Sequence, residues 1–151
     1  MYRHFTESVE KVVKRASQIA REYGQDYVGT EHILLAIRHE GVGLGNKVLE
    51  DRGISAERLK DEIDKLVRKS LEDTWVFGRL PGTPHFRNVV ANALEEAEQM
   101  KADKLRTEHL ILALLKEDGS VACRALQNLG CDYATVRAEA AANTNGQVTE
   151  P

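Results

Sequence analysis

The chain has 151 residues and a formal net charge of −3, with 42% hydrophobic and 30% charged side chains. These values are typical of a soluble globular domain and lack the strong basic excess of most nucleic-acid binders. No apolar stretch approaches the length of a membrane helix, and no secretory signal opens the chain, so we expect a cytoplasmic protein. Because no Cys/His cluster occurs and this compartment is reducing, we expect Cys123 and Cys131 to be free thiols.

The first predicted helix follows Thr6, a residue type that commonly caps helix N-termini. Apolar residues recur at i, i+3, i+4 and i+7 from Val9 to Tyr23, which is the pattern of one buried helix face. A second helix is predicted to begin at Thr30, a capping residue followed by Glu31. Because Ile33 to Ile37 is apolar almost all round, we expect this second helix to lie at the centre of the fold.

Two further helices complete the first unit. A third helix is predicted over 44–51, and Gly53 stands where glycine commonly ends a helix. The fourth starts at Ser55, or at Asp132 in the second copy, both good capping residues, and in the first copy it carries one apolar face. The segment 70–82 is predicted to be a connector, whose Trp75 and Phe77 cover an edge of the core or, as the alternative, anchor a partner.

The same four elements then recur along the chain. Thr30-Glu31-His32 is repeated as Thr107-Glu108-His109, an offset of 77 residues (107 − 30), and the same ungapped offset pairs Thr6 with Thr83. One copy alone would leave its apolar face in water, so the two copies are expected to pack together. We predict an all-α fold of two pseudo-symmetric four-helix repeats in one globular domain over 1–142. Repeat one covers 5–69, repeat two covers 83–142, and the tail at 143–151 is expected to be disordered.

No catalytic constellation accompanies these helices. The glycine run from Gly41 to Gly45 lacks the spacing of a phosphate-binding loop, and no H-E-x-x-H motif occurs. His32 and His39 leave a His/Glu metal-dependent enzyme as an alternative, but hydrogen bonds near a helix start are the preferred role of His32 and His109. A DNA-reading helix-turn-helix is disfavoured, because the second helices lack the polar side chains that contact base edges. We expect no enzyme activity, no cofactor and no metal.

The segment from Gly29 to Gly43, GTEHILLAIRHEGVG, resembles the G-T-E-H-I-L-L-x-L-x-x-E-G-x-G signature of the N-terminal domains of Clp (Hsp100) unfoldases, of the ClpC type. Phe5-Thr6-Glu7 and Thr83-Pro84 are similar to the starts of that family's two repeats, and the resemblance covers about residues 2–140. The second copy departs from the pattern at Arg106, where the family usually has glycine, and at His85, where arginine is common.

The resemblance implies a domain that sits ahead of two ATPase modules and hands them protein substrates or adaptor proteins. Domains of the ClpC type also recognise phosphorylated arginine, and the matching positions are Thr6 with Glu31 in the first copy and Thr83 with Glu108 in the second. A helix start can hold a phosphate, and a glutamate can receive a guanidinium. The same Thr and Glu also favour a helix start without any ligand.

We therefore expect a recognition domain of, or an accessory protein for, a Clp AAA+ unfoldase-protease. Its expected partners are a Clp ATPase, adaptor proteins and protein substrates, with no nucleic acid and no membrane. The alternative is a free-standing structural protein that docks on a Clp complex without ligand sites.

Overall fold

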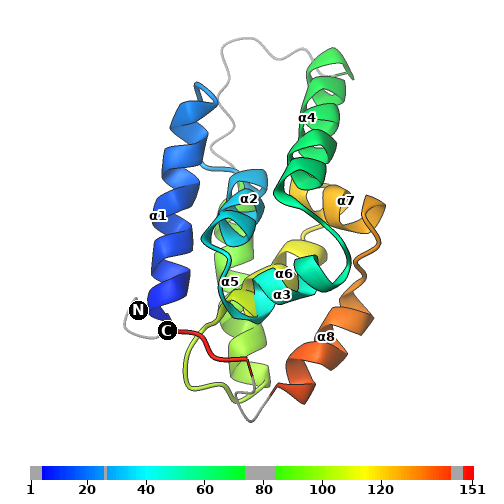
Figure 1. Ribbon diagram of the computed structural model, residues 1–151. Helices are drawn as coiled ribbons and strands as arrows, with labels where there is room; N and C mark the ends of the chain where they lie inside the picture. The colour runs from blue at the N-terminus through cyan, green and yellow to red at the C-terminus, as the bar shows by residue number, and fades with distance from the viewer. Residues whose placement is uncertain (1–4, 26, 74–83, 144–147) are drawn as a thin grey trace.

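A computed structural model describes residues 5–25, 27–73, 84–143 and 148–151 and arranges them as an all-α fold (Figure 1). Within these residues the helices are α1 (Glu7–Glu22), α2 (Thr30–Glu40), α3 (Gly43–Asp51), α4 (Ala56–Asp73), α5 (Pro84–Gln99), α6 (Thr107–Lys116), α7 (Val121–Asn128) and α8 (Tyr133–Ala142). Four helices belong to each repeat, which confirms the predicted fold. Helix α4 runs to Asp73, so the connector predicted from residue 70 begins later than expected, and Trp75 and Phe77 lie outside the described residues.

Side-chain caps begin several helices where the sequence predicts them. The Val9 N–H donates to Thr6 Oγ1 at 3.1 Å at the start of α1. The Thr135 N–H donates to Asp132 Oδ1 at 2.9 Å at the start of α8. Gly53, which follows α3, has a φ of +69°, the left-handed conformation in which glycine commonly terminates a helix. These starts and stops need no contact from a distant part of the chain.

Helices α2 and α6 form the centre of the molecule (Figure 1). Every residue of α6 from Thr107 to Leu115 is buried, as the all-round apolar sequence predicts. Helix α1 packs on α2, and α5 packs on α6. In addition, α3 packs on α6 and α7 packs on α2, so the third helix of each repeat covers the central helix of the other.

The two repeats exchange hydrogen bonds reciprocally. The Gly45 N–H in α3 donates to Thr107 Oγ1 at 3.0 Å, and the Ala122 N–H in α7 donates to Thr30 Oγ1 at 3.3 Å. The offset of 77 residues converts each bond into the other, so the halves are related by a pseudo-two-fold axis, in which each side offers the same groups to its partner. At Gly45 the helices approach so closely that a Cβ would lie 2.8 Å from the Cβ of Thr107.

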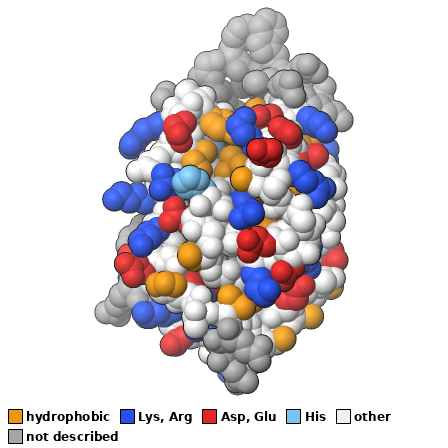
Figure 2. Space-filling model, in the orientation of Figure 1, with side chains coloured by type: hydrophobic (Ala, Val, Ile, Leu, Met, Phe, Trp, Pro, Cys, Tyr) orange, Lys and Arg blue, Asp and Glu red, His pale blue; other side chains and the backbone are white. Residues whose placement is uncertain are grey.

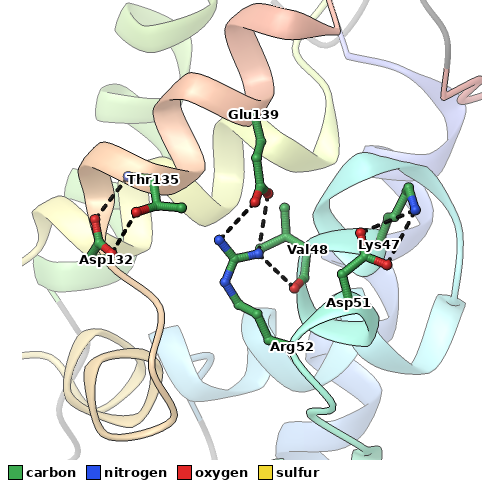
Figure 3. Close-up of polar contacts among 7 residues, drawn as sticks. All are labelled: Lys47, Val48, Asp51, Arg52, Asp132, Thr135 and Glu139. Atoms are coloured by element: carbon green, nitrogen blue, oxygen red, sulfur yellow. Dashed lines mark hydrogen bonds and ion pairs between the residues drawn. The ribbon is translucent and has the colours of Figure 1, made fainter.

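An ion pair also joins the repeats (Figure 3). The guanidinium of Arg52, at the end of α3, donates to both carboxylate oxygens of Glu139 in α8 at 2.9 and 3.2 Å. The same guanidinium donates to the Val48 carbonyl at 3.1 Å, which fixes the side chain against its own helix. Two parallel bonds of this kind add geometric specificity to the contact between the halves.

The outer surface carries charges of both signs, and Figure 2 shows them interspersed over the face seen in Figure 1. Hydrophobic side chains gather on this face in a shallow groove that Ile19, Leu35 and Ala56 line together with Tyr23. The second repeat has Tyr133 in place of Ala56, and the Tyr133 hydroxyl donates to the buried Glu96 at 2.6 Å. Within the described residues, no helix is both long and apolar enough to cross a bilayer.

Candidate functional site

Histidine organises the start of both central helices. The Gly29 N–H donates to His32 Nδ1 at 2.8 Å, and the Arg106 N–H donates to His109 Nδ1 at 2.9 Å. Burial lowers the pKa of each histidine to about 4. Both rings therefore stay neutral at physiological pH and accept a hydrogen bond at Nδ1. This geometry confirms the structural role predicted for His32 and His109.

The predicted caps of α2 and α6 are displaced by one residue. The N-cap residues are Gly29 and Arg106, and Thr30 and Thr107 stand at the first helical position. A capping threonine would use its hydroxyl within its own helix. Here the hydroxyl of Thr30 instead accepts the bond from the other repeat, so the prediction that these threonines are caps is wrong.

Glu31 and Glu108 follow these threonines and are 6% and 3% exposed, respectively. Burial raises the pKa of Glu31, while its own backbone N–H and the nearby His85 act in the opposite direction. Burial likewise raises the pKa of Glu108 to about 6, and its own backbone N–H opposes the shift. Among the described residues, neither carboxylate lies within ion-pair distance of a cation. Each site thus offers a buried acceptor without a salt-bridge partner.

The structure pairs the predicted site residues across the repeats rather than within them. The ring of Tyr23, at the end of α1, lies edge-on to His32 in α2 with 5.8 Å between centroids, so α1 and α2 are antiparallel. Thr6 and Glu31 therefore lie at opposite ends of α1, whose 16 residues span about 24 Å. The expectation that these two residues share one site is wrong.

Thr6 instead lies beside the start of α6. Its N–H donates to the Leu105 carbonyl at 3.0 Å, two residues before Thr107. This contact brings Thr6 into the site that contains Glu108. By the same symmetry, Glu31 belongs with the start of α5, and His85 in the first turn of α5 is close enough to act on its pKa. Thr83, the fourth predicted site residue, lies outside the described residues.

The two sites differ in the space beside the glutamate. A cavity of about 190 Å³ adjoins Glu108 and is lined by Met100, Lys101, Arg106 and Asn143 among others. In the first repeat the position equivalent to Met100 is Tyr23, whose ring packs against His32. At Gly29 an added Cβ would collide with the Glu31 carboxylate, whereas the equivalent residue of the second repeat, Arg106, carries a Cβ, so the two sites also differ at this position.

Two residues of the second site were not predicted. Asn143 follows α8 and is 6% exposed, and its Oδ1 accepts from the Val148 N–H at 2.9 Å. Glu150 reaches the start of α6 and hydrogen-bonds Thr107. Both lie in the tail predicted to be disordered at 143–151, but residue 143 and residues 148–151 make defined contacts here. Nothing in the periodicity of the chain marks them.

Two cysteines are the remaining reactive side chains in the described core. Cys123 and Cys131 form no disulfide, as predicted, and both lie buried, which raises the pKa of both thiols. Over the described ranges, no group of three or more His, Cys, Asp and Glu side chains is arranged to hold a metal ion.

Two copies of one four-helix unit that exchange contacts at their helix starts define a duplicated helical repeat domain. The sequence profile of the Clp repeat (R) N-terminal domain matches residues 4–102 and 82–151. The chain therefore belongs to the Clp repeat N-terminal domain family, which confirms the resemblance.

Curated relatives are Clp proteins that are much longer than this chain. The chain is 38% identical over 139 residues to the "ATP-dependent Clp protease ATP-binding subunit ClpA homolog, chloroplastic" of Brassica napus, covering 92% of this chain and 16% of that protein. It is also 38% identical to "Chaperone protein ClpC1, chloroplastic" of Arabidopsis thaliana, covering 92% of this chain and 15% of that protein. The chain thus spans about one sixth of the length of these relatives. The names of both relatives describe them as chloroplastic. The cytoplasmic location expected for this chain stays a prediction.

Solved structures share the fold. The N-terminal domain of ClpD from Arabidopsis thaliana superposes with a TM-score of 0.66 at 22% identity, covering 97% of this chain and all (100%) of that chain. The Hsp104 N-terminal domain from Candida albicans superposes with a TM-score of 0.63 at 16% identity, covering 95% of this chain and 91% of that chain. At these identities the likeness establishes the fold alone.

Proposed function

We propose that this domain recognises protein substrates or adaptor proteins for a Clp AAA+ unfoldase-protease, either as part of the ATPase or as an accessory protein. Membership of the Clp repeat N-terminal domain family supports this role. The relatives named above are an ATP-binding subunit of a Clp protease and a chaperone. The domain itself is proposed to be non-catalytic, because its distinctive polar groups are buried acceptors at helix starts and not a nucleophile with a base.

The observation that carries the ligand proposal is the pair of buried glutamates. Glu31 and Glu108 each lose hydration without gaining a salt bridge among the described residues, which is why the pKa of each is raised. A guanidinium would supply the missing countercharge through two parallel hydrogen bonds. The neighbouring helix start would supply free N–H groups and the positive end of a dipole to an attached phosphate.

Phosphorylated arginine on a protein chain combines these two groups. We propose that one such side chain binds between Thr6 and Glu108, with the phosphate toward the start of α6. A second is proposed to bind between Glu31 and the start of α5, where Thr83 stands in the sequence. The crossed pairing places each ligand at the junction of the two repeats.

Titration with free phosphoarginine, followed by amide NMR, tests the proposal. We expect shifts at Glu31 and at Glu108 with millimolar ligand, and weaker shifts with arginine or inorganic phosphate alone. The Glu108→Ala and Glu31→Ala variants should each abolish binding at one site. Glu98→Ala removes an exposed carboxylate from α5 and should change nothing. Unmoved amides at both sites contradict phosphoarginine recognition, and a Clp ring still captured by the Glu31→Ala, Glu108→Ala double variant would favour docking without ligand sites.

A further inference from the structure

A carboxylate from the chain itself already lies in the site at the start of α6. The Thr107 N–H donates to both oxygens of Glu150 at 3.1 Å, and the Thr107 hydroxyl donates to Oε1 at 2.6 Å. The Thr6 hydroxyl donates to Oε2 in a short hydrogen bond. Donors from the first helix of one repeat and the second helix of the other thus converge on one anion.

The hydrogen-bond roles of both threonines are consistent with this arrangement. Thr6 Oγ1 accepts from the Val9 N–H, and Thr107 Oγ1 accepts from the Gly45 N–H. Each hydroxyl therefore has its single proton left for the Glu150 carboxylate. An ionised carboxylate offers acceptors only, so the two hydroxyls and the Thr107 N–H are each matched to an acceptor.

The surrounding segment is held at three further points. The Val148 N–H donates to the buried Asn143, and the Val148 side chain packs against the core. The Ser8 N–H at the start of α1 donates to the Pro151 carbonyl at 3.0 Å. At Gly43, whose φ is +84°, a Cβ would collide with Glu150 Oε1. The site therefore has a shape and a set of hydrogen-bond donors that fit this carboxylate, and these contacts hold it in place against repulsion from Glu108.

From these contacts we infer that the segment Val148–Pro151 is an intramolecular ligand that competes with anionic peptide ligands for the Thr6–Thr107 site. This inference rests on the proposed function, because it names a regulator of the same site. A bound phosphate would need the Thr107 N–H and the two hydroxyls that Glu150 now uses. The contacts of Glu150 involve Thr6 and Thr107 and not the site of Glu31, so the two sites should differ in ligand affinity.

The test compares the whole chain with its Glu150→Ala variant, using phosphoarginine and inorganic phosphate as separate probes in amide NMR titrations. If the Glu150 carboxylate occupies the site about 90% of the time, its loss in this variant should raise the apparent affinity at Thr107 roughly tenfold. Affinity at Glu31 should stay unchanged, which makes that site an internal control. Glu98→Ala, which removes an equal charge from the exposed face of α5, should leave both sites as they were.

A second readout does not depend on any ligand. Glu150 raises the pKa of the Glu108 carboxyl by charge repulsion, so Glu150→Ala should lower that pKa and move the Thr107 amide resonance. An unmoved Thr107 amide overturns the inference, because the contact would then be absent in solution. A moved amide with no gain in affinity for either probe also overturns it, because the tail would then be purely structural. If phosphoarginine binds at neither site but inorganic phosphate binds more tightly near Thr107 in the Glu150→Ala variant, phosphoarginine is not the ligand. That result would still support competition between Glu150 and an anion for this site.

Discussion

Lowering the pH from about 7.5 to about 4.5 should destabilise the domain, chiefly through His32 and His109. Each ring accepts a backbone hydrogen bond at Nδ1 in a buried position. Protonation would turn that acceptor into a donor facing another N–H and would place a charge in the core. The folded state therefore binds these two protons less readily than the unfolded chain.

The magnitude follows from the pKa values. Burial lowers the pKa of each histidine from 6.5 to about 4, so stability that is fully present above pH 6.5 is lost as the pH falls toward 4. At pH 4.5 the loss is about 2.5 kcal/mol per histidine, or about 5 kcal/mol together. Glu108 acts in the opposite direction, because burial raises its pKa from 4.5 to about 6 and its protonation favours the folded state by about 1.5 kcal/mol. Burial also raises the pKa of Glu31, and its protonation acts in the same direction as that of Glu108. The net loss is therefore at most about 3.5 kcal/mol, which is still a large part of the 5–15 kcal/mol typical of a folded domain.

Urea unfolding followed by circular dichroism at several pH values measures this loss. The double variant His32→Gln, His109→Gln keeps a side-chain acceptor that does not titrate, so its stability should no longer fall over this range and should rise slightly through Glu108. His39 is exposed on α2, and the matched variant His39→Gln should retain the full pH dependence.

NMR titration of the imidazole resonances provides the decisive check. If His32 and His109 titrate near 6.5 in the folded protein, the buried-acceptor argument is refuted. A wild-type stability that is flat between pH 7.5 and 4.5 would refute it equally.

Three further perturbations follow from the packing. Gly45→Ala should destabilise the domain by about 1–2 kcal/mol in thermal unfolding, because the added Cβ would overlap the Thr107 side chain. Ala122→Gly, at the equivalent position of the second repeat, should cost about 1 kcal/mol or less. If the Gly45→Ala variant is more stable than the parent protein, the two helices do not approach as closely as described. A double-mutant cycle on Arg52→Ala and Glu139→Ala should give a coupling of about 0.5–1 kcal/mol, since Glu139 is 38% exposed, and zero coupling would mean that solvent screens the pair. Both cysteines should resist a thiol reagent in the native protein, and two equivalents should react in denaturant. Rapid labelling of the native protein would show that the thiols are not buried.

The amphipathic patterns, together with the capping residues and the glycines that end helices, are sufficient to predict the helices. Thr6 and Asp132 cap helices through groups three residues away, and Gly53 ends one by its own backbone conformation, so neighbouring residues determine them. The duplication extended the same assignment to the second repeat, and the apolar sequence of α6 predicted its burial.

The pairing of site residues was not predictable in the same way. Sequence matching placed Thr6 with Glu31 because both belong to the first copy, but the antiparallel packing of α1 on α2 separates them by the length of a helix. Likewise, the sequence around Thr30 is compatible with a hydroxyl that caps its own helix. Only the packing of α7 shows that this hydroxyl accepts the Ala122 N–H instead.

The sequence by itself determined that this protein is two copies of a four-helix unit, because helix periodicity and caps are short-range properties written in each segment. Only the tertiary structure decided that each site is built from both copies and that Glu150 fills one of them. Those contacts join groups up to 144 positions apart, and their formation depends on how apolar faces dock and which buried donors are left to satisfy.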